Sequence, residues 1–256
     1  MAKILVIGGG AMGSAFTIPC LDNKNNVTIT EPYSKQFINN LKSKNKFHSV
    51  LKIKLPKKLK FRIFSKELLK EKFNLIVIAL SLPGINFISK ELKNIKNKTP
   101  ILILTKGLKY DKKRNKILTI SEQIKISTKI KNISVLKGPC LAKELARKNQ
   151  TKVIIANKNI NIAKKIGKLI STNYYLVEYS TDIIGVEVCS AIKNIYAMVI
   201  GAGQSLNMSS SLFQKSLIEM KYLTKYFNGK ETTVESLAGV GDLYVSAAGG
   251  RNSKMG

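Results

Sequence analysis

The chain has 256 residues, 44% of them hydrophobic, and a formal net charge of +29. A chain of this length and hydrophobicity can bury a sizeable core, which excludes a disordered protein and fits one large domain or a larger domain with a smaller partner. The apolar run Ile4–Ile7 is too short for a signal sequence. No later run approaches the roughly 20 apolar residues that span a bilayer, so we expect a cytoplasmic protein without membrane insertion.

Lysine supplies nearly all of the positive charge, because arginine occurs only at positions 62, 114, 147 and 251. The lysines are spread along the chain among many Asn and Ile residues, a pattern typical of AT-rich codon usage. We therefore expect no nucleic-acid partner. The alternative is that the charge has a role, such as steering phosphorylated substrates into a site.

Cysteine and histidine are too few and too scattered to form a metal site. Cys20, Cys140 and Cys189 lie far apart without a CxxC pair, which predicts reduced thiols rather than zinc ligands or disulfides. His48 is the single histidine. It has no second ligand at metal-binding spacing, and we expect a structural histidine that is half-buried or on the surface.

Apolar β-rich runs alternate with helix-like segments up to about residue 180. Several runs, such as LIVIAL and ILIL, are continuously apolar, which indicates strands buried on both faces of a mainly parallel sheet. The predicted strands are Lys3–Gly8, Asn26–Thr30, Phe61–Phe64, Asn74–Leu80, Ile101–Thr105, Ile133–Lys137, Lys152–Ala156 and Tyr174–Tyr179. Predicted helices between them include Ser34–Lys44, Ile85–Ile95 and Ile160–Ser171. The fold class is therefore α/β, with a Rossmann-like doubly wound domain over residues 1–180.

The hydrophobic pattern changes after Tyr179, where apolar residues begin to recur at three and four residues. The residues at this spacing are Ile184, Val188, Ala191, Ile195 and Val199. This spacing predicts a smaller, all-α domain over residues 181–256. Because no low-complexity linker intervenes, we expect the boundary near Thr181 to pass directly into a long helix.

A glycine-rich turn follows the first strand. The sequence Gly8-Gly9-Gly10-Ala11-Met12-Gly13 has GxGxxG spacing, and it stands between the strand KILVI and an apolar helical segment. In this context Gly8 permits a tight turn, Gly10 lets a pyrophosphate approach the backbone, and Gly13 lets helix and strand pack closely. The free N–H groups at the helix start, at Ala11 and Met12, favour an anion. The turn predicts a dinucleotide site, although Pro19 is expected to kink or shorten the helix that follows.

Glu31 closes the second predicted strand, about twenty residues beyond the glycines. A carboxylate at this place accepts hydrogen bonds from the adenosine ribose and repels a 2′-phosphate. Glu31 therefore favours NAD over NADP, although the neighbouring lysines could soften the repulsion. The alternative is a surface glutamate at a strand end.

Four later segments, together with the glycine turn, resemble the bacterial NAD(P)-dependent glycerol-3-phosphate dehydrogenases. The order and approximate spacing of the segments match that family over nearly the whole chain. They are Leu104-Thr105-Lys106-Gly107-Leu108, then Gly138-Pro139-Cys140-Leu141-Ala142-Lys143-Glu144, then Gly185-Val186-Glu187 with Ala191-Ile192-Lys193-Asn194, and Leu237-Ala238-Gly239-Val240-Gly241-Asp242-Leu243 followed by Arg251-Asn252.

The resemblance implies roles for three charged residues. Lys193 matches the family's catalytic lysine, which gives a proton to the developing alkoxide or takes it in the reverse direction. A neighbouring cation would lower its pKa, and Lys106 is the obvious neighbour, matching a residue that contacts both substrate and cofactor. Asp242 matches a substrate-binding aspartate that could also orient Lys193.

The remaining matches are substrate-binding and cofactor-binding positions. Gly138 and Cys140 correspond to positions that touch the substrate, and Ala142 to one that lines the cofactor site. Arg251 and Asn252, preceded by Gly250, match the grip on the substrate phosphate, and Arg251 is also expected at the cofactor. Two weaker matches are Asn194, which would support the neighbouring Lys193, and Glu187, which would act on Lys193 indirectly.

The chain also departs from the family pattern. Position 140 is usually Ser or Thr, Gly250 replaces a serine, and the stretch from Asp242 to Arg251 is about two residues shorter. The chain ends soon after the Arg-Asn pair, where family members continue through further helices. Either the gene is shortened or the chain is a fragment. If nothing replaces those helices, we expect less cover over Leu212, Leu217, Met220 and Leu223, and hence reduced stability or a homodimer.

These observations predict an oxidoreductase that reversibly reduces dihydroxyacetone phosphate to sn-glycerol 3-phosphate with NAD(P)H and supplies glycerophospholipid synthesis. Two alternatives stay open. One is a related two-domain dehydrogenase with another substrate, which the phosphate grip at Arg251 and Asn252 argues against. The other is a shortened, non-catalytic protein that binds a dinucleotide or an anionic partner.

Overall fold

The computed structural model describes residues 1–43, 45–93, 99–128, 130–249 and 255. Eight strands form a central sheet: β1 (Lys3–Ile7), β2 (Asn26–Thr30), β5 (Lys60–Phe61), β6 (Leu75–Ile78), β7 (Ile101–Ile103), β10 (Ile133–Lys137), β11 (Thr151–Ala156) and β12 (Tyr175–Ser180). Their spatial order is β12-β11-β10-β7-β6-β1-β2-β5. Neighbouring strands run parallel except for β10 and β11. The predicted parallel sheet is therefore confirmed, but its β11–β12 edge runs in the opposite direction.

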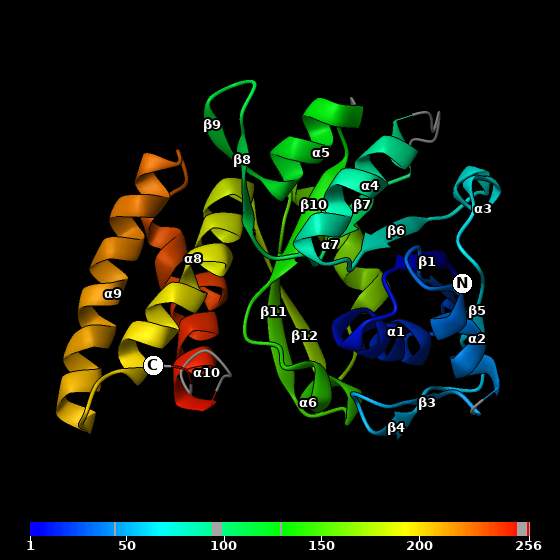
Figure 1. Cartoon of the computed structure of the whole chain (residues 1–256), viewed down its shortest axis with the longest axis horizontal. Helices are drawn as coiled ribbons and strands as arrows, with labels where there is room; N and C mark the ends of the chain where they lie inside the picture. Colours follow the sequence, from blue (N-terminus) through cyan, green and yellow to red (C-terminus); the bar gives the residue numbers. More distant parts are fainter. Residues whose placement is uncertain (44, 94–98, 129, 250–254, 256) are drawn as a thin grey trace.

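Both faces of the sheet are covered by helices, as the continuously apolar strands predict (Figure 1). Alternate residues of β1 enter separate cores, with Leu5 and Ile7 in one and Ile4 and Val6 in the other. The helices that cover the sheet are α1 (Ala11–Asp22), α2 (Lys35–Ser43), α3 (Lys66–Lys70), α4 (Leu82–Leu92), α5 (Ile120–Thr128), α6 (Ala142–Ala146) and α7 (Ile160–Ile170). Helices α3, α4 and α5 pack in the first core, and α1, α2, α6 and α7 in the second.

Most predicted elements agree with the structure to within a few residues, and the differences are local. Helix α4 begins three residues before the predicted start at Ile85, because Pro83 occupies its first turn. Lys44 and Ile95, the predicted ends of two helices, lie outside the described residues. Pro19 lies inside α1, which nevertheless continues to Asp22.

Two hairpins were not predicted from the sequence. The strands β3 (Phe47–His48) and β4 (Ile53–Lys54) form one of them, and β8 (Leu108–Asp111) and β9 (Lys116–Thr119) form the other. The strand predicted at Phe61–Phe64 is instead the two-residue β5, which pairs with β2. Strands of two to four residues are too short to show a clear alternation of polar and apolar residues, which explains why sequence periodicity misses them.

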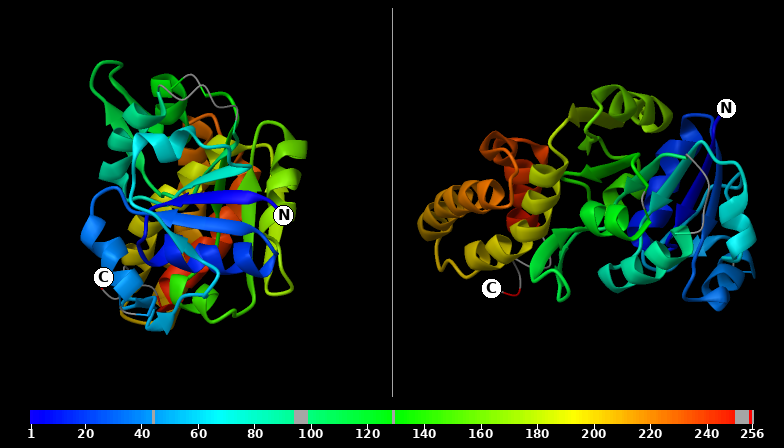
Figure 2. Two further views of the ribbon diagram at one scale, coloured as in Figure 1. Left: turned by 90° about the vertical axis from the view of Figure 1, so that its right-hand side faces the viewer. Right: turned by 90° about the horizontal axis from the view of Figure 1, so that it is seen from above.

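The chain after β12 is helical, as predicted. It contains α8 (Ile183–Gly201), α9 (Leu206–Tyr226), the short helices η1 (Glu231–Glu235) and η2 (Leu237–Gly241), and α10 (Asp242–Gly249). These helices lie together at one end of the molecule (Figure 2). Helix α8 carries Val186, Val188 and Cys189 into the core shared with α4 and α5, so the helical part packs against the sheet. Although α8 is long and apolar enough to span a membrane, 61% of its apolar window is buried in the molecule.

Helix α9 exposes a row of large apolar side chains. Ile218, Tyr222 and Tyr226 recur every four residues and are 57%, 71% and 72% exposed. Met220 is fully buried, so the expectation that it lacks cover is wrong. Leu212, Leu217 and Leu223 are only partly buried. The exposed apolar face of α9 therefore consists of Ile218, Tyr222 and Tyr226, and not of the residues that the sequence suggested.

Candidate active site

The glycine turn joins β1 to α1 at the carboxyl edge of the sheet. Gly8 has φ of +118°, and a Cβ there would lie 2.4 Å from the carbonyl oxygen of Ala79. A Cβ on Gly13 would lie 2.0 Å from the carbonyl oxygen of Gly8. A Cβ on Gly10, in contrast, would meet no described atom within 4 Å. Gly8 and Gly13 are therefore required by packing, whereas Gly10 leaves its side of the turn open to a ligand.

The start of α1 faces this open side. Gly10 is the N-cap residue and offers no side chain to the first turn, where Ala11 and Met12 are the first two helical residues. The N–H groups of an uncapped first turn carry partial positive charge and bind anions. The local structure therefore fits the pyrophosphate of a dinucleotide.

Glu31 lies directly beside the glycine turn. One of its carboxylate oxygens accepts a hydrogen bond from the N–H of Gly9 at 2.8 Å, and the other accepts from Tyr33 at 3.1 Å. The end of β2 is thereby tied to the turn after β1. This contact places a negative charge where the sequence predicts the ribose-binding carboxylate.

His48 supports the same turn, and its expected position was wrong. The side chain is 2% exposed, and Nε2 lies 3.2 Å from the carbonyl oxygen of Gly9. Nδ1 accepts a hydrogen bond from the N–H of Leu51 at 3.2 Å, so the neutral ring with the proton on Nε2 satisfies both contacts. Burial lowers the pKa of His48, which favours this neutral form. The ring of Phe37 packs edge-on against it.

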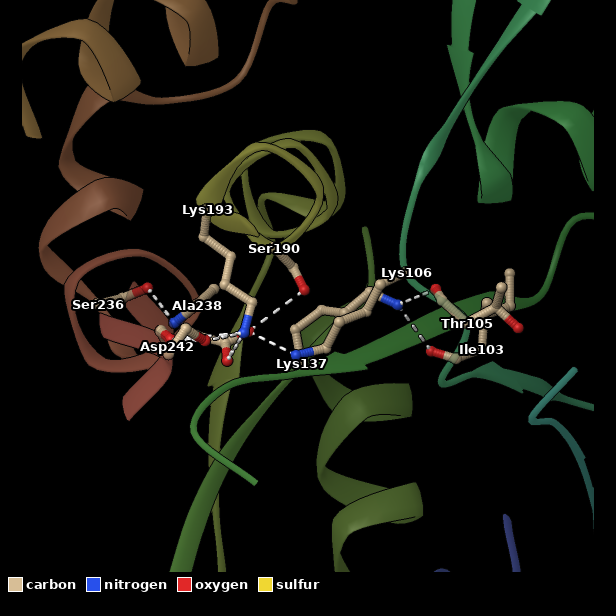
Figure 3. Close-up of polar contacts among 10 residues, drawn as sticks. Ile103, Thr105, Lys106, Lys137, Ser190, Lys193, Ser236, Ala238 and Asp242 are labelled. Carbon is tan, nitrogen blue, oxygen red and sulfur yellow. Dashed lines mark hydrogen bonds and ion pairs between the residues drawn. The ribbon is translucent and has the colours of Figure 1, made fainter. Parts of the chain in front are cut away.

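Two lysines and one aspartate converge between the helical part and the sheet (Figure 3). The Nζ of Lys193, on α8, lies 2.7 Å from Oδ1 of Asp242, the first residue of α10. The Nζ of Lys106, which follows β7, lies 2.6 Å from Oδ2 of the same carboxylate. Asp242 thus joins two residues that are 87 positions apart (193 − 106) in the sequence.

The environment of Lys193 changes its proton affinity. The side chain is 8% exposed and also donates a hydrogen bond to Ser246. Its pKa is lowered, chiefly by burial and secondarily by the positive charge of Lys106, while Asp242 opposes the shift. The predicted lowering by Lys106 is present, but it ranks second to the loss of solvent.

The Gly138–Ala142 segment follows β10 at the same edge of the sheet. Gly138 has φ of +119°, a conformation that side chains other than glycine rarely adopt. Cys140 is half-buried, and burial raises the pKa of its thiol to about 12, so the neutral thiol prevails at neutral pH. Ala142 begins α6, which packs in the same core as α1. The segment therefore runs from the end of β10, beside β7, to a helix that packs against α1.

Two buried charged residues lie behind the site, and the sequence predicted the partner of neither. Glu187 accepts hydrogen bonds from the backbone N–H and the hydroxyl of Ser121 on α5, rather than from Lys193. Lys137, the last residue of β10, is fully buried, and the sequence analysis did not single it out. Asn194, expected to support Lys193, is half-buried on α8. The predicted phosphate-binding residues Gly250, Arg251 and Asn252 lie outside the described residues.

Comparisons with known protein families match two consecutive parts of the chain. Residues 3–163 match the NAD-dependent glycerol-3-phosphate dehydrogenase N-terminus, and residues 182–256 match the C-terminus of the same family. The match therefore includes both the glycine turn and the Lys193–Asp242 pair.

Individual proteins give the same result. The chain is 32% identical to glycerol-3-phosphate dehydrogenase [NAD(P)+] from Rickettsia conorii, with 99% of this chain and 79% of the relative covered. It is 30% identical to the NADP(+)-dependent glycerol-3-phosphate dehydrogenase from Archaeoglobus fulgidus, with 99% and 78% covered. Among solved structures it resembles glycerol-3-phosphate dehydrogenase from Coxiella burnetii, with a TM-score of 0.87, 26% identity, and 98% and 78% covered. The chain belongs to the NAD-dependent glycerol-3-phosphate dehydrogenase family.

Proposed function

We propose that the protein catalyses reversible hydride transfer between NAD(P)H and dihydroxyacetone phosphate, which gives sn-glycerol 3-phosphate. The observation that carries this proposal is the Lys193–Asp242–Lys106 cluster at the carboxyl edge of the sheet, in which Lys193 and Asp242 are buried. Ligands of doubly wound sheets bind at this edge. A proton donor and a second cation are thereby available where a phosphorylated ketone would lie.

The N-terminal residues fit a dinucleotide. The N–H groups of Ala11 and Met12 and the open side of Gly10 would hold the pyrophosphate, Gly8 and Gly13 shape the turn, and Ala142 would line the site. When bound, the nicotinamide supplies or accepts the hydride. We propose that NAD is preferred, because the carboxylate of Glu31 would repel the 2′-phosphate of NADP.

Lys193 acts as the general acid during reduction. As hydride reaches the carbonyl carbon, Nζ donates a proton to the oxygen, and hydride plus proton together complete the two-electron reduction. Lys193 is left neutral and regains a proton from solvent before the next turnover. Burial favours this neutral state, because it lowers the lysine pKa. Asp242 holds Nζ in place through its 2.7 Å contact.

Lys106 and the segment after β10 bind the substrate. Two ammonium groups around one carboxylate leave the cluster with an excess positive charge, which complements a dianionic phosphate. We assign the remaining contacts to Gly138, Cys140, Gly250, Arg251 and Asn252, with Arg251 as the bidentate phosphate ligand and as a further contact to the cofactor.

The two parts of the chain divide this work. In our proposal residues 1–180 bind the dinucleotide, and residues 181–256 bring the acid–base lysine. Asp182, the N-cap residue of α8, lies at the boundary between them. The reaction supplies sn-glycerol 3-phosphate in the cytoplasm for glycerophospholipid synthesis.

An activity assay with one lysine variant tests this proposal. The purified protein should oxidise NADH when dihydroxyacetone phosphate is added, measured as loss of NADH absorbance. In Lys193→Met, kcat should fall by about 10² to 10⁴, because the general acid is removed. Lys164→Met, an exposed lysine on α7, should retain full activity.

Two outcomes would contradict the assignment. A parent protein that binds NADH without oxidising it would support the non-catalytic alternative. A Lys193→Met variant as active as the parent would leave the reaction in place but remove Lys193 from it.

A further inference from the structure

Lys137 is a buried lysine, and its hydrogen-bond partners among the described residues are backbone carbonyls. Its side chain extends from the end of β10 to the end of β7, where Nζ lies 2.5 Å from the oxygen of Thr105 and 3.4 Å from that of Ile103. The residue is 2% exposed. Among the described residues no carboxylate lies close enough to form an ion pair with it. Burial of a charge without an ionic partner is costly, so a buried lysine in this position requires an explanation.

The charged groups around Lys137 all belong to the candidate site or to the core behind it. Glu187 on α8 favours the charged amine, Lys106 disfavours it, and Asp242 favours it more weakly. The β11 residues paired with β10, at positions 154–156, carry no charge, and the buried residues of α5 are uncharged too. Desolvation outweighs these effects and lowers the pKa of Lys137 to about 8. The amine is therefore mostly charged at pH 7 and mostly neutral at pH 9.

The contact with Thr105 connects Lys137 to the substrate-binding lysine. Thr105 is held from two sides, because its hydroxyl donates to the carbonyl oxygen of Leu80 at 2.7 Å and its own carbonyl accepts from Lys137. Lys106 is the next residue, and its Nζ reaches Asp242. Figure 3 shows Lys137, Thr105 and Lys106 between α8 and the ends of the strands.

We propose that Lys137 is a positioning residue for the substrate phosphate: its ammonium group fixes the end of β7, and with it Lys106, and adds positive charge behind the site. This inference rests on the proposed function, because it assumes that a dianionic phosphate binds at Lys106. When Lys137 loses its proton, the attraction for the dianion weakens. A neutral amine still donates to a carbonyl, but it gives a weaker hydrogen bond than an ammonium.

Binding of dihydroxyacetone phosphate in the presence of NAD⁺ tests this role without turnover, because no hydride is available for the ketone. Calorimetry should give a Kd that rises about tenfold between pH 7 and pH 9. The substrate phosphate, with a pKa near 6, is already dianionic at pH 7, so its own titration does not cause this rise. In Lys137→Met, Kd at pH 7 should be about tenfold higher than in the parent, and it should change by less than about threefold up to pH 9.

Lys137→Arg provides the rescue, because its guanidinium remains charged at pH 9 and can donate to the same carbonyls. Its Kd should stay low at both pH values. Lys152→Met is the matched control, since it removes an exposed lysine from the neighbouring strand β11, where Lys152 is paired with Glu178. Its Kd should follow the parent at each pH.

The outcomes separate the two proposals. A parent Kd that does not change from pH 7 to pH 9 would overturn the role of Lys137 even if the methionine variant does not fold. Equal, pH-independent weakening in the methionine and arginine variants would reduce Lys137 to a packing residue. If the parent binds but shows no NADH oxidation, the proposed reaction fails and the role of Lys137 stands. If it binds no dihydroxyacetone phosphate, both fail.

Discussion

Asp242 connects the two ends of the candidate site. Its side chain is 3% exposed, and each of its oxygens accepts a hydrogen bond from a different lysine. An unpaired carboxylate in this position would be costly, so the two ammonium groups stabilise it and are oriented by it. The same arrangement leaves Lys193 with a lowered pKa, because burial outweighs the attraction of Asp242. Asp242 therefore fixes the geometry of the proton donor, whereas burial lowers its pKa.

Cofactor preference depends on a single carboxylate. In Glu31→Gln, the negative charge beside Gly9 is lost while an amide oxygen can still accept its N–H. We expect kcat/KM with NADH to fall by about tenfold, because a hydrogen bond from the ribose to a charged group contributes about 1.5–3 kcal/mol. With NADPH, kcat/KM should stay constant or rise. Parallel initial rates with the two cofactors measure the ratio.

Glu178→Gln is the control for this change, since Glu178 is a half-exposed glutamate on β12 paired with Lys152. Its NADH to NADPH ratio should equal that of the parent. An unchanged ratio in Glu31→Gln would mean that Glu31 only ties β2 to the glycine turn.

Motif residues could be predicted from the sequence, whereas their supporting residues could not. Gly8 and Gly13 are identified by their spacing, and both are required by the structure: Gly8 has a φ of +118°, and a Cβ on Gly13 would collide with the carbonyl oxygen of Gly8. Lys137 has no local signal, because lysine is common throughout the chain and only the fold shows that this one is buried. For His48 the sequence predicted a half-buried or surface position, because only the fold shows what surrounds it. Its burial arises from contacts with Gly9 and Phe37, which lie in other elements.

At the scale of elements, Asp182 fixes the start of α8 and ties it to η1. Oδ1 accepts a hydrogen bond from the N–H of Gly185 at 2.9 Å. Oδ2 accepts from the backbone N–H of Lys230 at 2.8 Å and from the hydroxyl of Thr233 at 2.6 Å. In Asp182→Ala we expect the free energy of unfolding to fall by about 2 to 4 kcal/mol, because a helix cap contributes about 1 kcal/mol and two further hydrogen bonds are lost. Urea unfolding followed by circular dichroism measures this loss.

Ser205→Ala is the comparison for Asp182, because Ser205 caps α9 through one contact, from the N–H of Met208 at 3.2 Å. It should cost only about 1 kcal/mol. Similar losses in both variants would mean that the contacts of Asp182 with η1 add nothing beyond the cap.

Elements with strong periodicity were predictable, and short or tertiary-dependent elements were not. Strands β2 and β10 coincide with their predicted bounds, because buried runs such as ISVLK carry the signal in themselves. The reversed direction of β11 relative to β10 has no such signal. A run of apolar residues specifies burial, whereas direction follows from the connection that precedes the strand, here a segment containing only the five-residue helix α6.

At the scale of the whole molecule, buried ionisable groups make stability depend on pH. Burial lowers the pKa of Lys137 in the folded state to about 8, below its ordinary value of 10.5. Between these values the unfolded chain binds more protons, so the free energy of unfolding rises with pH by about 1.4 kcal/mol per unit. The lowered pKa of Lys193 acts in the same direction. We therefore expect stability to increase from pH 8 toward pH 9.

Buried thiols reverse this trend at higher pH. Burial raises the pKa of Cys189 from its ordinary value of 9.0 to about 11 and that of Cys140 to about 12, and it raises the pKa of Cys20 further. Above pH 9 the unfolded chain loses these protons while the folded chain keeps them, so each thiol lowers the free energy of unfolding by up to about 1.4 kcal/mol per unit. Above pH 9 these three thiols outweigh the two lysines, which predicts a maximum of stability near pH 9. Urea unfolding at intervals between pH 7 and pH 10 measures the curve. Lys137→Met should flatten its rising limb, and Cys20→Ala should weaken its falling limb. Stability that declines steadily from pH 7 would show that the surface charge, rather than these buried groups, sets the pH dependence.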